Sequence, residues 1–396
     1  MGDTIDLAAV RADTPGVTDV IHLNNAGAAL APAPVVDAVR DWVAREARVG
    51  GYELAEREAD RVARVYDAGA ALLNCAPDEI AFAENATRAW DMAFYAFDFA
   101  PGDRILTGAA EYVSNYVAFL HVARRTGARV EVVPDDEHGQ LSVDALRELI
   151  DERVRLVAVT HVPTNGGLVN PAAAIGAVTR AAGIPFLLDA CQSAGQLPLD
   201  VQAIGCDLLS LTGRKYVRGP RGTGLLYARR ELAQRLHPPM IDLHAAAWVA
   251  RDRYELRPDA RRFENWETNY AGKVGLGVAI DYALQLGLDA IWARTHALGE
   301  RLRELVAALP GVRLRDLGAQ RCGIVSFTAE GERPRELRDR LLARGVNTWF
   351  SETPSTRIDM EQRGLDAVLR VSVHYYNSER ELERFTELLA DELARG

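Results

Sequence analysis

Cysteine and lysine are the scarce residues of this 396-residue chain. The four cysteines, Cys75, Cys191, Cys206 and Cys322, lie far apart and lack the spacing of metal-ligand motifs. We therefore expect free, buried thiols in a reducing compartment and no metal site. Only two of the 46 basic residues are lysines, and a lysine kept where arginine dominates indicates a need for an amine that can lose its proton.

The chain also lacks an excess of cationic charge and any long apolar run. Its formal net charge of -10 argues against nucleic acid as the main partner, because no surplus of cations exists to neutralise phosphates. No segment approaches the roughly 20 apolar residues that span a bilayer. The N-terminal segment MGDTIDLAAVRADTPG does not have the pattern of a signal peptide. We expect a soluble, cytoplasmic protein without a membrane partner.

Short apolar runs alternate with amphipathic stretches between about residues 75 and 230. This alternation predicts an α/β fold, in which right-handed crossovers build a mostly parallel sheet covered by helices on both faces. Residues 35–73 are predicted to be helical from the spacing of their apolar positions. The predicted strands are RILTG (104–108), ARVEVVP (128–134), VRLVAVTHV (154–162), IPFLLDA (184–190), DLLSLTG (207–213) and TGLLYA (223–228).

The pattern changes after about residue 270. A predicted helix over 272–308 precedes the strands VRLRD, GIVSFTA and LRVSVHYY, with the helices RPRELRDRLLARG and SERELERFTELLADELA between and after them. We expect an N-terminal arm at 1–20, a large domain at 21–268 and a smaller α+β domain at 269–396. Ligands of such folds bind at the carboxyl ends of the parallel strands, at the border between the domains.

Two chemically distinctive residues end neighbouring predicted strands. Asp189 ends IPFLLD, where a carboxylate either caps a helix or pairs with a cation such as a protonated pyridine nitrogen. Lys215 follows DLLSLT and Gly213-Arg214. Burial and neighbouring cations would lower the pKa of this lysine and free its amine for imine formation, while the alternative is a solvated loop lysine. Together the two residues form a more specific signal than either does alone.

The segments DACQSAGQLPLDV (189–201) and LLSLTGRKYVRGPRGTGLLY (208–227) resemble the cofactor core of the class V aminotransferase superfamily. That superfamily includes cysteine desulfurases, isopenicillin N epimerase, kynureninase and several carbon–sulfur lyases. The resemblance extends from NNAG near residue 24 to the strand at 370. It implies the fold-type I fold of PLP-dependent transferases, with a large, mostly parallel seven-stranded sheet. It also implies a homodimer that binds pyridoxal 5'-phosphate (PLP) and a small amino-acid substrate.

The resemblance assigns cofactor contacts residue by residue. Lys215 would form the Schiff base and later move the Cα proton, Asp189 would pair with the ring nitrogen, and Gln192 would bind the ring hydroxyl. ENATRAW (84–90) matches the phosphate loop, although without the resemblance it is simply a capped helix. A helix N-terminus suits a phosphate dianion. The residues placed at the phosphate are Ala86 and Thr87 through their amides, Thr212, Arg214, and Thr268 or Asn269 of RFENWETN (262–269) from the neighbouring subunit.

Two further segments match regions beside the cofactor ring. In EYVSN (111–115), Tyr112 stands where desulfurases carry a histidine stacked on the ring. A tyrosine can stack but is a poor acid near neutral pH, and packing in the core is its alternative role. THVPTNGG (160–167) matches a loop that places an asparagine near the substrate carboxylate and the cofactor. Here the aligned residue is Thr164, with Asn165 beside it.

The expected substrate contacts come from both ends of the chain. VLRVSVHYYN (368–377) matches the strand whose arginine binds the α-carboxylate, and Arg370 is that residue. A bidentate guanidinium suits this task. NNAG (24–27) would add a contact to the substrate carboxylate through its backbone or through Asn24 or Asn25, with a surface turn as the alternative. Arg218 and Arg221 would either meet a polar substrate tail or lie solvated on the surface.

The reaction is inferred from what the matched segments contain. Desulfurases need a cysteine on a loop of the small domain to take up sulfur as a persulfide, and the matching segment GVNTWFSETPSTR (345–357) has none. The block LTGRKYVRGPRGTG and the tyrosine of EYVSN resemble lyases that cleave cysteine S-conjugates in actinobacterial natural-product and thiol metabolism. We therefore expect β-elimination to pyruvate, ammonia and a thiol. Decarboxylation-coupled oxidative deamination of the conjugate and epimerisation of an amino acid stay open. A non-enzymatic protein is disfavoured because Lys215, Asp189 and Arg370 are all present.

Overall fold

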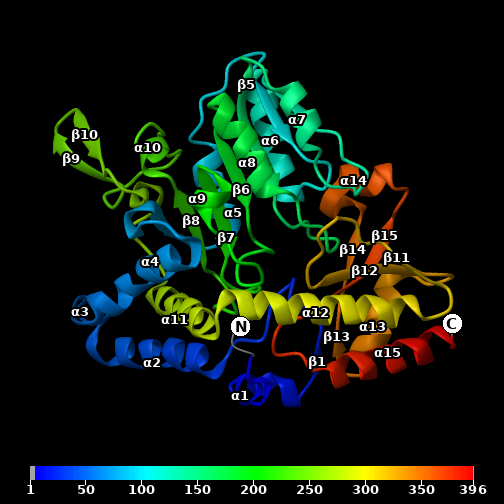
Figure 1. Cartoon of the computed structure of the whole chain (residues 1–396). Coiled ribbons are helices and arrows are strands. Elements are labelled where there is room, and N and C mark those ends of the chain that lie inside the picture. The colour runs from blue at the N-terminus through cyan, green and yellow to red at the C-terminus, as the bar shows by residue number, and fades with distance from the viewer. Residues whose placement is uncertain (1–4, 396) are drawn as a thin grey trace.

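The computed structural model describes residues 5–395, and a seven-stranded sheet lies at the centre of the larger part (Figure 1). Its strand order is β2-β8-β7-β6-β5-β3-β4, with β8 antiparallel to both neighbours and β4, β3, β5, β6 and β7 parallel. All six predicted strands of this region are confirmed, and with them the mostly parallel α/β fold. The strands are β2 (Ile80–Ala83), β3 (Arg104–Thr107), β4 (Arg129–Val132), β5 (Val154–Thr160), β6 (Phe186–Asp189), β7 (Leu208–Thr212) and β8 (Gly224–Ala228).

Helices cover both faces of this sheet. Leu187 and Leu188 are neighbours on β6 and point to opposite faces, because successive side chains of a strand alternate. Leu188 belongs to a core that includes residues of α4 (Ala59–Leu73), α8 (Ala172–Ala182) and α11 (Tyr270–Leu286). Leu187 belongs to a core with residues of α5 (Ala86–Phe94) and α6 (Val113–Thr126). The helices of this layer include α5 (Ala86–Phe94), α6 (Val113–Thr126), α7 (Val143–Leu149), α8 (Ala172–Ala182), α9 (Val201–Ile204) and α10 (Arg230–Ala233).

Both stretches that were predicted to be helical contain breaks. Residues 35–73 form α2 (Ala33–Val49), α3 (Gly51–Arg57) and α4 (Ala59–Leu73). Residues 272–308, predicted as one helix, form α11 (Tyr270–Leu286) and α12 (Leu288–Ala307), which are bent by 81°. Gly50 and Gly287 lie at two of the three breaks with φ of 94° and 84°, a backbone conformation that only glycine adopts at little cost. Within residues 5–395 no single helix is long and apolar enough to cross a membrane, although α11 and α12 together would reach that length.

The C-terminal part contains a four-stranded antiparallel sheet in the order β11-β12-β15-β14. Its elements are β11 (Val312–Leu314), β12 (Ile324–Ala329), α13 (Pro334–Ala343), β14 (Trp349–Glu352), α14 (Arg357–Gln362), β15 (Ala367–Ser372) and α15 (Glu379–Leu393). The chain begins beside this sheet: after α1 (Leu7–Ala12), β1 (Ile21–His22) pairs with β13 (Val346–Asn347), and Leu23 lies in the C-terminal core. The domain boundary predicted at residue 21 therefore falls on a strand that contacts the smaller part.

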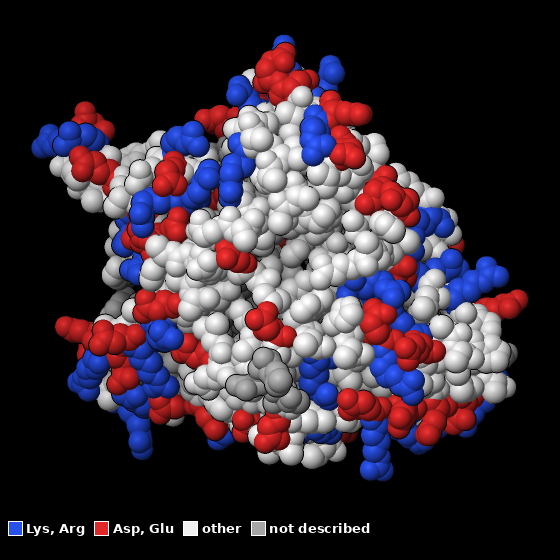
Figure 2. All heavy atoms as spheres, viewed as in Figure 1, with Lys and Arg blue, Asp and Glu red and all other residues white. Residues whose placement is uncertain are grey.

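A hairpin of β9 (Ala246–Ala250) and β10 (Arg253–Leu256) projects from the body of the molecule (Figure 1). The sequence did not predict this hairpin, because its strands of five and four mostly exposed residues carry neither a continuous apolar run nor regular alternation. Figure 2 shows that basic and acidic side chains are interspersed around the visible face, including at the hairpin, and that the middle of this face is mostly uncharged.

Candidate active site

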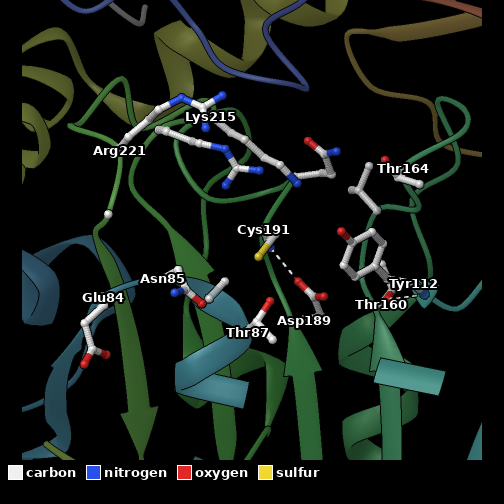
Figure 3. A pocket seen from close by; sticks show the side chains of 15 residues that line it. Glu84, Asn85, Thr87, Tyr112, Thr160, Thr164, Asp189, Cys191, Lys215 and Arg221 are labelled. Carbon is white, nitrogen blue, oxygen red and sulfur yellow. Dashed lines mark hydrogen bonds between the residues drawn. The ribbon is translucent and has the colours of Figure 1, made fainter. Parts of the chain in front are cut away.

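A cavity of about 340 Å³ opens at the carboxyl ends of β5, β6 and β7, where the N-terminus of α5 also points (Figure 3). This is the edge of the sheet at which the sequence predicts ligand binding. Each of these three strands contributes to the lining: Thr160 ends β5 and Thr164 follows it, Asp189 ends β6, and Lys215 follows β7. The topology thus brings residues from 160 to 215 together beside the first turn of α5.

Lys215 and Asp189 share this cavity. Burial lowers the pKa of Lys215 to about 8, so its amine is available in the neutral form at mildly alkaline pH. Asp189 is 4% exposed, and each of its oxygens accepts one hydrogen bond: Oδ1 from the Cys191 amide at 2.9 Å and Oδ2 from Asn115 Nδ2 at 2.9 Å. A nucleophilic amine and a buried carboxylate, which the sequence placed at neighbouring strand ends, therefore line one site.

Gln192 and the start of α5 offer unsatisfied hydrogen-bonding groups to the same cavity. The Gln192 side chain is buried and donates from Nε2 to the Ala26 carbonyl at 3.2 Å, while its Oε1 has no partner. Asn85 caps α5 by accepting from the Arg88 amide at 2.9 Å. The next two residues, Ala86 and Thr87, line the cavity at the first turn, where helix amides lack internal acceptors and favour an anion.

The three arginines near Lys215 in the sequence have different surroundings. Arg214 lines the cavity and donates to the Thr212 hydroxyl at 2.9 Å. Thr212 does not line the cavity itself but holds Arg214 in place. Arg221 is exposed and lines the cavity. Arg218 is 1% exposed, has a left-handed φ of 62° and donates to the Thr14 hydroxyl at 2.6 Å. Neither role considered for Arg218, a substrate contact or a solvated surface residue, fits this placement.

Tyr112 and Cys191 lie beside Asp189 (Figure 3). Tyr112 precedes α6, and its amide donates to Thr160 Oγ1 at 3.3 Å. Cys191 and Thr160 also line the cavity but were not predicted at the site. The position of Cys191 between Asp189 and Gln192 is a sequence signal from which its place in the lining could have been inferred. Burial and the Asp189 charge raise the pKa of Cys191 far above its ordinary value, which keeps this thiol protonated and poorly nucleophilic.

Arg370 is a buried cation that faces neutral partners. It is 4% exposed, and its Nη1 donates to both the carbonyl and the hydroxyl oxygen of Thr164 at 2.9 Å. Its Nη2 donates to Asn24 Oδ1 at 3.2 Å, and its Nε has no partner. Burial lowers the pKa of Arg370 to about 10, so it stays cationic at neutral pH. Within the described residues no carboxylate pairs with this guanidinium, and a buried charge of this kind is suited to an incoming anion.

Three other predicted residues lie outside this cavity lining. The prediction that Asn25 contacts substrate is wrong, because its fully buried side chain bonds the Ser372 carbonyl at 2.7 Å and the Tyr376 hydroxyl. Asn24 is the residue of NNAG that reaches Arg370. Asn165 donates to Thr356 Oγ1 at 2.6 Å, and its Oδ1 is unpaired. Thr268 is half-buried in the segment before α11, so its predicted contact in a neighbouring subunit stays a prediction.

The residues present fit PLP. One cavity contains an amine of lowered pKa, a buried carboxylate, an unpaired amide oxygen and free helix amides, which match the aldehyde, ring nitrogen, ring hydroxyl and phosphate of that cofactor. Among residues 5–395, no group of three or more His, Cys, Asp or Glu side chains could hold a metal ion.

Comparisons with known proteins agree with this site. The sequence model described as Aminotransferase class-V matches residues 21–385. A probable cysteine desulfurase from Methanothermobacter thermautotrophicus is 29% identical over 394 residues, which cover 98% of each chain. A probable cysteine desulfurase from Xylella fastidiosa strain 9a5c is 32% identical over 381 residues, covering 93% of this chain and 90% of the relative.

Solved structures extend the similarity to the whole fold. The apo structure of a cysteine desulfurase from Thermococcus onnurineus NA1 superposes with a TM-score of 0.92 at 26% identity and covers 100% of both chains. The cystine C–S lyase C-DES, solved with its product cysteine persulfide, has a TM-score of 0.86 over 96% of this chain, and at 24% identity this shows the fold alone. The chain is a PLP-dependent enzyme that belongs to the class V aminotransferase family.

Proposed function

We propose that this enzyme is a carbon–sulfur lyase that cleaves a cysteine S-conjugate by β-elimination. The observation that carries the proposal is the composition of segment 345–357, which lies beside the site and contains no cysteine. Thr356 of this segment bonds Asn165, which is adjacent to the Thr164 that holds Arg370. A persulfide acceptor on this segment is therefore absent, while the residues proposed to remove the Cα proton are present.

Cys191 does not replace such an acceptor. Cys191 stands two residues after Asp189, the last residue of β6, and its raised pKa keeps it in the thiol form. Cys206 and Cys322 are buried, and Cys75 lies at the end of α4. The relatives are named as cysteine desulfurases, but the sulfur acceptor that desulfuration requires has no counterpart on the expected segment. This difference favours expulsion of sulfur together with its substituent.

Four residues of the chain hold and orient the reacting groups in this proposal. When bound, PLP supplies an electron sink for the pair that a broken bond leaves at Cα. Asp189 would keep the proton on the ring nitrogen, and Gln192 would hydrogen-bond the ring hydroxyl. Arg370 would bind the α-carboxylate and so orient the Cα–H bond for proton removal. Lys215 Nζ would then take the Cα proton.

The elimination balances without a further reactant except water. As the Cα–H bond breaks, its electron pair forms the Cα–Cβ double bond, and the Cβ–S bond pair leaves with sulfur as a thiolate. The released 2-aminoacrylate tautomerises and hydrolyses to pyruvate and ammonia. Arg214 and Arg221 line the cavity with the predicted phosphate loop, where they would offset the phosphate charge.

The decisive experiment incubates the PLP-loaded enzyme with S-substituted L-cysteines, their sulfoxides and free L-cysteine. Pyruvate, ammonia and thiol released in equal amounts from an S-conjugate support the proposal. Alanine with sulfane sulfur from L-cysteine would refute it in favour of desulfuration, carbon dioxide with an aldehyde would indicate the decarboxylating reaction, and inversion at Cα with the C–S bond intact would indicate an epimerase. If sulfane sulfur is formed from L-cysteine, its loss in a Cys191→Ala variant would identify this thiol as the acceptor.

We also propose a cytoplasmic homodimer that buries the segment 240–266. Large apolar side chains are exposed along this segment, including Leu243 at 69%, Trp248 at 80% and Trp266 at 46%. Exposed aromatic residues that gather on one projecting element are typical of protein interfaces. The segment leads directly to Thr268, so a second copy packed on it would bring Thr268 to the neighbouring cavity.

A further inference from the structure

Glu111 is a buried carboxylate directly behind the cavity and takes no part in the proposed reaction. It is 3% exposed and lies in the connection between β3 and α6. Its Oε2 accepts from the Thr160 amide at 2.9 Å and from the Thr107 hydroxyl at 3.1 Å. Its Oε1 accepts from Asn115 Nδ2 at 2.8 Å and from the Thr160 hydroxyl. These hydrogen bonds offset part of the cost of burying the carboxylate.

The Asn115 amide connects this carboxylate to Asp189. Asn115 lies one helical turn after Glu111 and is 3% exposed. Its Nδ2 contacts Glu111 Oε1 at 2.8 Å and Asp189 Oδ2 at 2.9 Å, so each of the two N–H groups serves one carboxylate. When ionised, Glu111 can only accept, and it then fixes the amide with its NH2 group, and not its carbonyl oxygen, toward Asp189.

A second path connects Glu111 to Tyr112. The Thr160 hydroxyl donates to Glu111 Oε1, which leaves its oxygen free to accept from the Tyr112 amide at 3.3 Å. The Tyr112 amide also contacts Glu111 Oε1 at 3.1 Å. Glu111 thereby restrains the backbone from which the Tyr112 ring extends toward the cavity (Figure 3).

We propose that Glu111 is a positioning residue that holds Asp189 and Tyr112, the two side chains predicted to contact the cofactor ring, in one frame through Asn115 and Thr160. Asp189 is the charged group that acts on Glu111 across the amide, and the other groups in contact with Glu111 are the neutral ones named above. Burial raises the pKa of Glu111 to about 7, with the Asp189 charge adding to this effect, so the carboxylate is mostly ionised above pH 8. This inference depends on PLP binding and not on the lyase reaction.

The test follows the absorbance of the PLP-loaded enzyme without substrate as the pH is changed. Glu111→Gln removes the negative charge and lets the Asn115 amide turn over. Because Asp189 is then no longer held in place, its negative charge favours the protonated cofactor less, and the pH of the spectral transition should fall by about one unit, the usual size of such an effect. Asn115→Leu breaks the connection to Asp189 but leaves Glu111 with its Thr107 and Thr160 donors, and it should give a similar fall.

Thr107→Val is the matched control. It removes one buried donor to Glu111, the Thr107 hydroxyl, which connects Glu111 to neither Asp189 nor Tyr112. The variant should therefore lower the melting temperature without moving the spectral transition. The double variant Glu111→Gln/Asn115→Leu should shift no further than either single variant, because both break one connection. The proposal would be overturned if Glu111→Gln and Asn115→Leu lowered the melting temperature, as Thr107→Val does, but kept the wild-type spectral transition. It would also be overturned if the shifts of the two single variants added up in the double variant. If Glu111→Gln does not fold, Asn115→Leu alone decides.

Discussion

Replacing Arg370 with alanine tests whether this buried cation binds the substrate carboxylate. In the substrate-free protein its hydrogen bonds go to Thr164 and Asn24, which are neutral, and Nε has no partner. Losing one partner of a buried, hydrogen-bonded charge pair costs about 3 kcal/mol, which corresponds to about a hundredfold fall in kcat/KM. Because the carboxylate contact also aligns the Cα–H bond, kcat should fall together with the rise in KM.

The assay compares thiol release from an S-conjugate with release from its α-carboxamide, for the wild-type enzyme and for Arg370→Ala. The wild type should prefer the carboxylate strongly, and the variant should discriminate by less than about tenfold, since the charge that reads the carboxylate is gone. Arg370→Lys should recover only part of the loss, because an ammonium group cannot form the planar bidentate contact. An Arg370→Ala variant that keeps its cofactor absorbance, its kcat/KM and its preference for the carboxylate would refute the assignment.

Three further predictions concern the cofactor, the assembly and a corrected residue. Lys215→Ala should abolish the visible absorbance of covalently bound cofactor. In the wild type, the rate at which the apoprotein captures PLP should rise with pH up to about 8 and then level off, because the Lys215 amine loses its proton there and not near 10.5. A capture rate that keeps rising to pH 10 would contradict this. Trp248→Asp should shift the enzyme toward monomers in sedimentation velocity, whereas Tyr52→Asp, at an equally exposed aromatic residue on α3, should not; a dimer unaffected by Trp248→Asp would remove segment 240–266 from the interface. Asn25→Ala should destabilise the protein by about 2 kcal/mol in urea unfolding with KM nearly unchanged, since it leaves buried polar groups unpaired away from the cavity; a large rise in KM at unchanged stability would restore the substrate contact.

Local pattern explains what could be predicted of the site. Asp189 and Lys215 each follow an apolar run that can only be a buried strand, and parallel strands end at the same edge of a sheet, so their proximity follows from the sequence. The start of α5 was visible in the same way, because Asn85 is a favoured N-cap residue. These inferences need only the order of the elements and the identity of the residues at their ends.

Residues whose role depends on contacts across the fold could not be assigned in this way. Asn24 and Asn25 are equivalent in the sequence, yet Asn24 reaches Arg370 from 346 positions away and Asn25 is buried against Ser372. Arg218 reads like a surface arginine, but the fold buries it against Thr14 and Tyr376, the latter with its ring centre 4.4 Å from the guanidinium carbon. Such differences depend on which distant segment packs beside each residue.

The sequence by itself determined the α/β fold, the strand ends that carry the lysine and the carboxylate, and the family to which they point. Each of these follows from patterns within a single element or from motifs of adjacent residues. The tertiary structure decided which buried groups are left without partners, namely Arg370 Nε and Gln192 Oε1, and which carboxylate stands behind Asp189. Hydrogen-bond satisfaction is a property of the complete packed chain, because partners such as Asn115 for Asp189 and Asn24 for Arg370 are supplied by segments far away in the sequence.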